Sequence, residues 1–450
     1  MATFCIKKGR NIPLKGAASK EIINLPVSQR IAIQPQDFRG LKLRPIVKVN
    51  DPVRVGTPIL MDKNNPDVRV LSPASGRVVV INRGEKRVLL EIVIELDGKQ
   101  EAEGFSSYSQ DQLKNISRED AIKSLLQGGM WPVIRQRPFS RVANPHDKPK
   151  SIFIHAMNTE PLAPDVDFIL SQEDEREFQA GLEVIKKLTK GQVYLCAAAG
   201  SKSKSITGAQ GVEVHYFAGQ HPAGNVSTHI HYLNPINKGD IVWYVEAQDL
   251  LKIGALFLKG NYPSVRTVIV TGEGAKNRLY VKTIMGSPVS ALLQGSDLQA
   301  KRCISGSVLT GKNIGANGFL RFYDSQFTII PEGGERQFLG WLTLGFGQFT
   351  LSRTCVSAFL PCREYSLDTD KNGSDRAIVM NQIYDSLVPL DILTYFLVKA
   401  ALAGDIEEME KLGILECDEE DFALCTFACP SKVDVGGIIR QGLDLIEKEG

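Results

Sequence analysis

The chain has 450 residues, of which 43% are hydrophobic and 23% charged, a composition typical of a globular protein with roughly two to four domains. Its 53 basic residues nearly cancel its 51 acidic residues, which argues against nucleic-acid binding. The first ten residues lack the apolar core of a signal peptide, and Lys399 interrupts the most apolar stretch, 392–403. We therefore expect a cytoplasmic chain without a transmembrane segment, and its eight cysteines to be free thiols, buried hydrophobes or metal ligands.

Residues 1–105 consist of short β-type runs separated by turn residues, which predicts a small β-sandwich or barrel. The clearest runs are 53–60, 68–70, 78–81 and 88–94. The order of turns resembles that of biotinyl/lipoyl-like domains, in which a lysine at a tight hairpin carries the cofactor. Lys63 has the matching neighbours, but the residues after it make a wider loop. It is therefore either an attachment site or a solvated loop lysine, and the loop favours the latter.

Residues 106–260 alternate between helical and strand patterns, which predicts a Rossmann-like α/β domain with a parallel sheet. Ser117 is the expected N-cap of a helix that ends at Gly128. The other expected elements are strands at 152–156, 193–197 and 212–217 and helices at 173–190 and 246–258.

The last two expected domains are 261–335 and 336–450. Predicted strands at 267–272, 279–283 and 304–311, with glycines between them, resemble the soluble-ligand-binding (SLBB-like) β-grasp domain. The final domain is expected to be mainly helical: Asp391 caps a helix that ends at Gly404, a second helix ends at Gly413, and a third covers 435–448. The predicted fold class is therefore multidomain α/β plus β.

Three stretches of the sequence indicate which protein family the chain resembles. They are IKKG followed by IPLKG near the start, HPAG followed by THIH at 221–231, and EED-x-ALCTF-x-CP at 419–430. Together they resemble the A subunits of the bacterial sodium-translocating NADH:quinone reductases (Nqr), which are related to RnfC and to the flavin-bearing subunit of complex I.

The resemblance implies a peripheral subunit on the cytoplasmic side of the bacterial inner membrane. It would belong to a complex that couples NADH oxidation and ubiquinone reduction to sodium export. Its expected partners are subunits B to F, chiefly a membrane-embedded one. NADH, FAD, FMN, iron–sulfur and riboflavin would be bound by other subunits, so this chain would carry no cofactor and have no independent activity. The alternative is an RnfC-like or complex-I-like electron-transfer subunit that binds flavin and iron–sulfur clusters itself.

The cysteines bear on that alternative, because Rnf relatives bind clusters through closely spaced cysteines. Cys417, Cys425 and Cys429 keep only the C-x-x-x-C-P end of such a pattern, and a fourth ligand would have to come from Cys355 or Cys362. We interpret them as a vestige made of buried thiols, with a bound cluster or zinc as the alternative. The loop 199–204 follows a strand and has lysines, so it is either a phosphate site or a solvated loop without the usual glycine pattern.

His221, His229 and His231 form the second candidate group. If 228–233 is a strand, His229 and His231 share a face, and a metal with His221 as third ligand is one hypothesis. The others are a structural or subunit-contact role, which we favour, and contact with a ligand or quinone. We predict no metal and no catalytic residue, because neither a Ser-His-Asp pattern nor a carboxylate pair is evident.

Trp131, Arg135, Arg137 and Phe139 combine aromatic rings with guanidinium donors, as a quinone site or a protein interface would. The favoured alternative is that the rings pack against the sheet and the arginines contact carboxylates. Two apolar segments, 338–349 and 387–403, are candidate docking surfaces or core.

Overall fold

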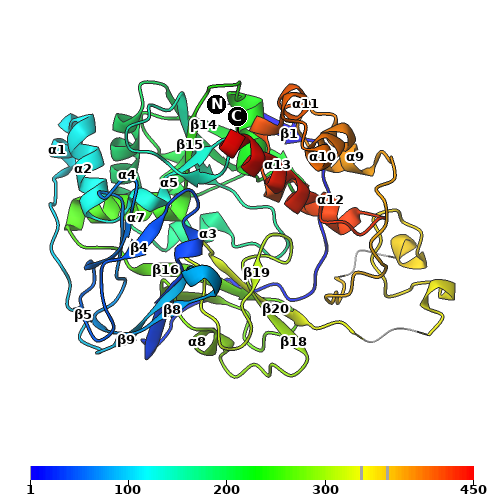
Figure 1. The fold of residues 1–450 in the computed structure, drawn as a ribbon, viewed down its shortest axis with the longest axis horizontal. Coiled ribbons are helices and arrows are strands. Elements are labelled where there is room, and N and C mark those ends of the chain that lie inside the picture. The colour runs from blue at the N-terminus through cyan, green and yellow to red at the C-terminus, as the bar shows by residue number, and fades with distance from the viewer. Residues whose placement is uncertain (1, 335–337, 361–363, 450) are drawn as a thin grey trace.

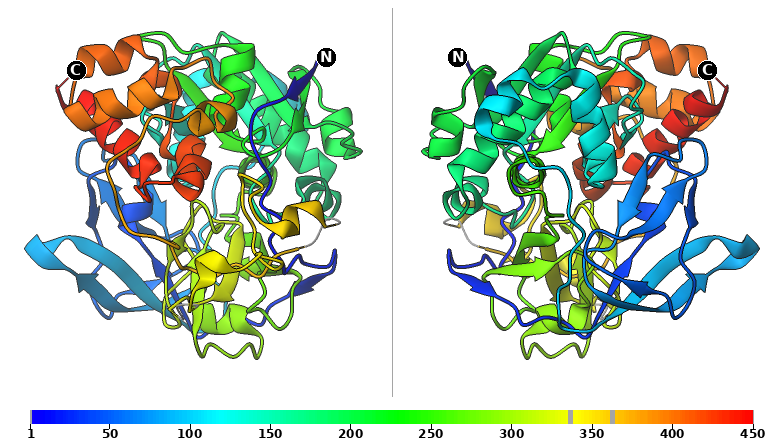
Figure 2. Two further views of the ribbon diagram at one scale, coloured as in Figure 1. Left: turned by 90° about the vertical axis from the view of Figure 1, so that its right-hand side faces the viewer. Right: turned by 90° about the vertical axis from the view of Figure 1, so that its left-hand side faces the viewer.

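The computed structural model describes residues 2–334, 338–360 and 364–449. These residues form four β-sheets and a group of C-terminal helices. In Figure 1 a seven-stranded sheet and its helices occupy the upper half, and a β-sandwich lies at lower left. A six-stranded sheet lies below, and the C-terminal helices lie at upper right. The two termini overlap only in that projection, since Figure 2 separates them to opposite sides of the molecule.

The β-sandwich consists of two small antiparallel sheets that share a core of valine, isoleucine and leucine side chains. The expected strands at 68–70, 78–81 and 88–94 are confirmed within two residues. A Cβ on Gly76, which ends the turn before the long hairpin, would lie 2.0 Å from the Glu95 carbonyl oxygen, so only glycine fits there. The strands are β3 (Arg30–Ile33), β4 (Leu43–Pro45), β5 (Pro52–Val53), β6 (Pro58–Asp62), β7 (Arg69–Leu71), β8 (Gly76–Arg83) and β9 (Leu89–Leu96).

The seven-stranded sheet contains most of the middle of the chain. Its strands are β1 (Thr3–Ile6), β10 (Arg135–Arg137), β11 (Arg141–Val142), β12 (Ser151–Ala156), β13 (Gln192–Ala198), β14 (Glu213–Gly219) and β15 (Val242–Glu246). Their order is β1-β14-β13-β12-β15-β10-β11. The first five are parallel neighbours, and β10 and β11 are antiparallel. Every residue of β12 is buried, as expected of a strand covered on both faces.

Helices connect and cover these strands. They are α1 (Gln110–Asn115), α2 (Arg118–Gln127), α3 (Val166–Ser171), α4 (Glu175–Leu188), α5 (Lys204–Thr207), α6 (Val226–Leu233) and α7 (Ala247–Lys259). The expected helices at 173–190 and 246–258 and the three expected strands are confirmed. The hydroxyl of Ser117 accepts from the Asp120 amide, so the predicted N-cap of α2 is confirmed as well.

The six-stranded sheet has the order β19-β18-β20-β16-β17-β2. Its elements are β2 (Ile22–Asn24), β16 (Val265–Thr271), β17 (Tyr280–Ile284), β18 (Lys301–Ser305), β19 (Lys312–Asn313), β20 (Gln326–Pro331) and the short helix α8 (Val289–Leu293). The predicted strands at 267–272 and 279–283 are confirmed. The predicted strand at 304–311 is wrong beyond Ser305, because the chain turns there and returns as β19.

The N-terminal segment, 2–24, connects two of the sheets. β1 pairs in parallel with β14, and β2 pairs in parallel with β17. The segment thus adds an edge strand to the seven-stranded sheet and another to the six-stranded one. Such pairing depends on partners that are remote in sequence, which no local pattern reveals.

The C-terminal helices are α9 (Ile383–Leu387), α10 (Thr394–Ala403), α11 (Ile406–Lys411), α12 (Ala423–Ala428) and α13 (Val435–Glu449), with 3-10 turns η6 (Ile414–Glu416) and η7 (Glu419–Phe422). Gly404 ends α10 in the left-handed conformation, with φ of 70°, as predicted. The predicted cap at Asp391 is wrong. The helix begins after Leu393, where the Asp385 carboxylate accepts from the Thr394 amide.

Within the described ranges, no helix combines the length and the apolar character that a membrane crossing needs.

The contact between α4 and α7 generates one prediction. A Cβ on Gly254 would lie 1.7 Å from the Glu177 carbonyl oxygen, so Gly254→Ala must push the two helices apart. We expect the free energy of unfolding to fall by about 2 kcal/mol, measured by chemical denaturation. Gly104→Ala is the control, because a Cβ there meets nothing within 4 Å. Equal stability of the two variants would contradict this packing.

Candidate functional site

The histidine-containing segment is a turn followed by a helix, so the predicted strand at 228–233 is wrong. α6 places His229 and His231 about 200° apart around the helix axis, on different faces. Threonine, histidine and isoleucine are compatible with a strand, but Val226 and Ile230, one turn apart, pack as a helical face into a buried cluster beside the sheet. The one-face geometry on which the metal hypothesis relied is therefore absent from this segment.

An ion pair between a buried histidine and a partly exposed glutamate lies at the carboxyl ends of β12 and β15. His155 donates from Nδ1 to Glu246, with both carboxylate oxygens at 2.9 Å, and from Nε2 to the Gly224 carbonyl oxygen. Burial alone would lower the pKa of His155, but the Glu246 carboxylate outweighs it and raises the pKa to about 9. The sheet thus contains a histidinium that fastens the HPAG turn.

The other two buried histidines stay neutral. Burial lowers the pKa of His221 to about 4, and its Nδ1 is 3.2 Å from the Thr159 hydroxyl. Burial and the charge on His155 lower the pKa of His229 well below its usual value. Its ring lies 5.3 Å from that of His155 and 4.2 Å from that of Phe217, centroid to centroid. These two imidazoles therefore belong to the core between α6 and the sheet.

Arg137 on β10 is the centre of a buried ionic network. Its side chain is 1% exposed, and its Nη1 and Nη2 lie 3.1 Å from Asp418 Oδ2 and 2.6 Å from Glu420 Oε1. Arg440 on α13 contacts the other Asp418 oxygen at 2.9 Å. Burial would raise the pKa of Asp418, but the two guanidinium groups hold that pKa below its usual range. For Glu420, burial outweighs Arg137 and raises the pKa.

Two further contacts join α6 to the C-terminal segment. The Asn225 amide donates to Asp421 Oδ1 at 3.0 Å, and His231 Nδ1 lies 2.7 Å from Glu416 Oε2. The HPAG…THIH stretch, the WPVIRQRPF stretch and the EED stretch, far apart in sequence, therefore meet at one place. We call Arg137, Asp418, Glu420, Asp421 and Arg440 the arginine–carboxylate cluster.

The other three predicted residues of the WPVIRQRPF stretch pack against different neighbours. Trp131 is fully buried, stands edge-on to Trp243 and donates from its indole to the Ala143 carbonyl oxygen at 2.7 Å. Arg135 lies over the rings of Tyr244 and Tyr323, 5.2 Å from each centroid. Phe139 is half-buried and packs against the C-terminal core.

The three C-terminal thiols are buried in the helical core. Burial raises the pKa of Cys417 and of Cys425, and Cys429 Sγ lies 2.9 Å from the Tyr384 hydroxyl. Cys355 is half-buried, and Cys362 lies outside the described residues. Across the described ranges, no group of three or more histidine, cysteine or acidic side chains is placed to bind a metal ion.

The loop 199–204 already binds a carboxylate of the chain itself, that of Asp167. The Ser201 hydroxyl and the Lys202 amide donate to the two oxygens of Asp167, at 2.7 and 2.9 Å. The position where a phosphate would accept these hydrogen bonds is thus filled by a carboxylate. Lys63 is exposed in the loop between β6 and β7.

Taken together, these contacts join the C-terminal segment to earlier parts of the chain. They fasten the C-terminal helices to β10 and to the segment around α6 through charge-assisted hydrogen bonds. Sequence reasoning missed His155, Glu246, Glu416, Asp418 and Arg440, because the groups that meet here are far apart in sequence: Arg137 and Glu420, for example, are separated by 283 residues. The one available signal was the run of acids at 418–421, which needs cations nearby if it is buried.

Comparison with known proteins matches three family models to three successive parts of the chain. The NqrA N-terminal barrel-sandwich hybrid domain matches residues 4–97, the NqrA second alpha/beta domain matches 116–262, and the NQRA C-terminal domain matches 267–315. The A subunit of the Na(+)-translocating NADH-quinone reductase of Yersinia pseudotuberculosis is 39% identical over 447 residues. The corresponding proteins of Neisseria meningitidis and Alcanivorax borkumensis are 37% and 39% identical, and each alignment covers 99% of both chains.

Fold and matches together define a class of multidomain α/β proteins in which a barrel-sandwich, an α/β and an SLBB domain share one chain. Within that class, the chain belongs to the NqrA family, the A subunits of the Na(+)-translocating NADH-quinone reductases.

The arginine–carboxylate cluster generates a stability prediction. Arg137→Met leaves Asp418 and Glu420 without their shared cation, so we expect the free energy of unfolding to fall by about 3 kcal/mol. Arg30→Met, which breaks the exposed pair with Glu95, should change it by no more than about 0.5 kcal/mol. Chemical denaturation of both variants beside the native chain is the measurement. A similar, small loss in both would show that the cluster is not a principal contact.

The His155–Glu246 pair predicts a pH dependence. Because the folded-state pKa of about 9 exceeds the ordinary value of 6.5, the pair stabilises fully below pH 6.5, and this stabilisation is lost as the pH rises towards 9. Glu246→Gln should therefore cost about 1–2 kcal/mol near pH 6, discounted for the exposure of Glu246, and almost nothing above pH 9. Thermal unfolding across this range tests it. A cost that stays constant or grows with pH contradicts the assignment.

Proposed function

We propose that this chain is a peripheral scaffold subunit on the cytoplasmic side of the bacterial inner membrane. Its complex would couple NADH oxidation and ubiquinone reduction to sodium export. The observation that carries this proposal is the end-to-end similarity to NqrA of Yersinia pseudotuberculosis, 39% identity over 99% of both chains. The role of the chain is to hold the complex together, while NADH, FAD, FMN, iron–sulfur clusters and riboflavin are bound by other subunits.

The chemistry of the candidate ligands supports a chain without its own electron carrier. Iron and zinc bind thiolates, and burial in an apolar core keeps Cys417 and Cys425 protonated. The loop after β13 is neutralised by Asp167. Flavin or iron–sulfur absorption in the visible spectrum of the purified chain would contradict this part of the proposal.

The seven predicted site residues act in joining the modules of the chain, and quinone contact by them is disfavoured. They are Trp131, Arg135, Arg137, Phe139, His221, His229 and His231. Four of them are at most 2% exposed, so a quinone ring has no access to them without rearrangement. Those modules are the sandwich domain 1–105, the Rossmann-like domain 106–260, the β-grasp domain 261–335 and the helical domain 336–450. The N-terminal segment acts as a connection between the second and third.

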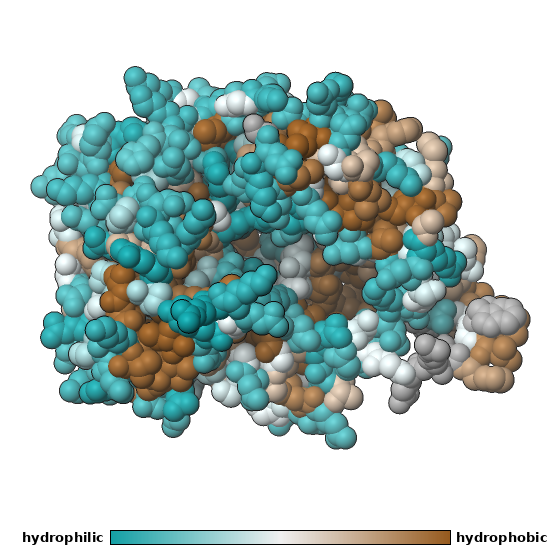
Figure 3. Space-filling view, in the orientation of Figure 1, coloured by the Kyte–Doolittle hydropathy of each residue, from teal (hydrophilic) through white to brown (hydrophobic). Residues whose placement is uncertain are grey.

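Exposed apolar side chains on the C-terminal helices support a docking surface for a membrane-embedded partner, one of the subunits B to F. Figure 3 shows apolar residues gathered over α9, α10 and α12. Leu393, Phe396 and Leu402 are between 49% and 60% exposed, although Leu387, Val388, Leu390, Leu397 and Val398 of the same stretch are core. In the segment 338–349 the exposed large apolar side chains described are Phe338, Leu339, Leu342, Leu344 and Phe346. Exposed apolar patches on a protein surface mark interaction sites.

The test is co-purification from detergent-solubilised bacterial membranes. Leu393→Asp with Phe396→Asp should reduce recovery of the membrane-embedded subunits about tenfold, because apolar anchors concentrate binding energy. Thermal stability should stay unchanged, since both side chains are already exposed. Val27→Asp, at an equally exposed residue of the sandwich domain, is the matched control.

Two outcomes count against the proposal in different ways. Undiminished recovery with the double variant would place docking on another face. Recovery of no membrane-embedded subunit with the native chain would overturn the proposed function itself.

A further inference from the structure

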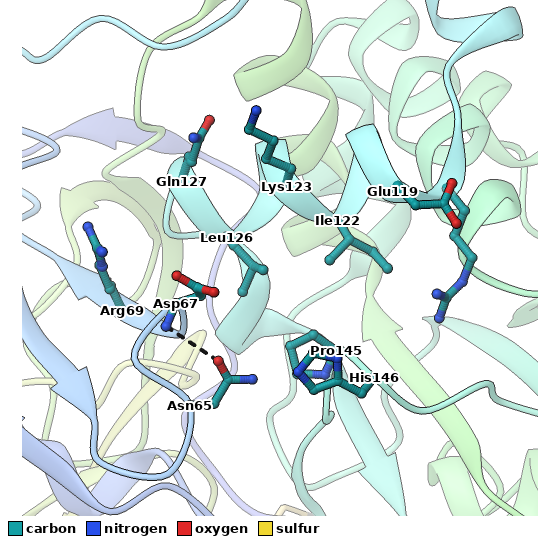
Figure 4. Close-up of a pocket in the computed structure, with 11 residues that line it drawn as sticks. Asn65, Asp67, Arg69, Glu119, Ile122, Lys123, Leu126, Gln127, Pro145 and His146 are labelled. Carbon is teal, nitrogen blue, oxygen red and sulfur yellow. Dashed lines mark hydrogen bonds between the residues drawn. The ribbon is translucent and has the colours of Figure 1, made fainter.

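A cavity of about 560 Å³ lies between the β6–β7 loop and α2, on the opposite side of the molecule from the C-terminal helices (Figures 1 and 4). Its volume is in the range of small-molecule sites. The proposed assembly role makes no use of it. Its lining consists of Asn65, Asp67, Arg69, Arg118, Glu119, Ile122, Lys123, Leu126, Gln127, Pro145 and His146.

One wall of the cavity is apolar. Ile122 and Leu126 lie one helical turn apart on α2, and Figure 4 shows both pointing towards Pro145 and His146. Both remain partly exposed, although the rest of this helical face is buried in the core. The wall therefore offers an apolar body of several carbons a place to exclude water.

The polar part of the lining contains cations without carboxylate partners. Arg118 is fixed by two backbone acceptors: Nε donates to the Leu188 carbonyl oxygen at 3.1 Å and Nη2 to that of Asp147 at 2.7 Å. The Arg69 side chain donates from Nε to the Pro66 carbonyl oxygen. In the part of the chain that the structure describes, Arg69, Arg118 and Lys123 form no ion pair. A guanidinium anchored in this way loses little entropy on binding an anion.

We propose that this cavity binds a small amphipathic monoanion, such as a medium-chain carboxylate. The apolar body would lie against Ile122, Leu126 and Pro145, and the anionic head would accept from Arg118. The charge of the lining supports one negative charge: three side-chain cations stand beside two carboxylates, those of Asp67 and Glu119. Because the site joins the sandwich loop to α2, its ligand stabilises one placement of these two modules.

The test follows the isoleucine δ-methyl signals of the full chain by NMR during titration with decanoate. Ile122→Val identifies the Ile122 signal by its disappearance. We expect this signal to shift and saturate, and Arg118→Gln to weaken decanoate binding about tenfold, the loss of one charge-assisted contact. Decanol, which lacks the charge, should bind the native chain and Arg118→Gln equally and weakly.

Controls separate a damaged fold from a lost ligand contact. Lys123→Gln removes a cation without touching the backbone anchors of Arg118, and should also weaken decanoate. Lys86→Gln, at the exposed tip of the β8–β9 hairpin, should leave binding unchanged. The proposal is overturned if the Ile122 signal stays still up to millimolar decanoate. It is equally overturned if neither the Arg118 nor the Lys123 variant changes the affinity. The proposed assembly function would stand in either case.

Discussion

The burial of Arg137 constrains the whole arrangement of the chain. A guanidinium that is 1% exposed is tolerated only if anions compensate it, and those anions come from Asp418 and Glu420, close to the far end of the chain. The C-terminal helices must therefore return to β10. Arg440 contacts Asp418, and the Asn225 amide donates to Asp421. Each carboxylate of this group therefore has a hydrogen-bond donor.

The carboxyl ends of the parallel strands are occupied by groups of the chain itself. Open α/β sheets bind ligands outside the carboxyl ends of their strands. Here the same edge contains the His155–Glu246 pair and the HPAG turn, and α6 above it is joined to the C-terminal segment through His231 and Glu416. The charged groups that might serve a ligand are engaged with one another, and the loop after β13 receives its anion from Asp167.

The polar interior contrasts with the apolar exterior of the C-terminal region. Its helices have a complete core around Leu397, Phe422 and Ile439, and yet leave Phe396 and Leu402 in solvent. A helix that needed only to cover its own core would not require these outer side chains. The same region is thus fastened to the sheet by charge on one side and offers apolar surface on the other.

The sequence by itself determined the local elements, because periodicity and caps act between near neighbours. Strands such as β12 and β13, helices such as α4 and α7, both ends of α2 and the C-terminal end of α10 could all be predicted in this way. The motifs also pointed to the family. Only the tertiary structure decided that 228–233 is a helix, that β1 and β2 join distant sheets, and that the three motifs meet. Those outcomes depend on long-range packing and on buried charges finding partners, and neither leaves a signal in neighbouring residues.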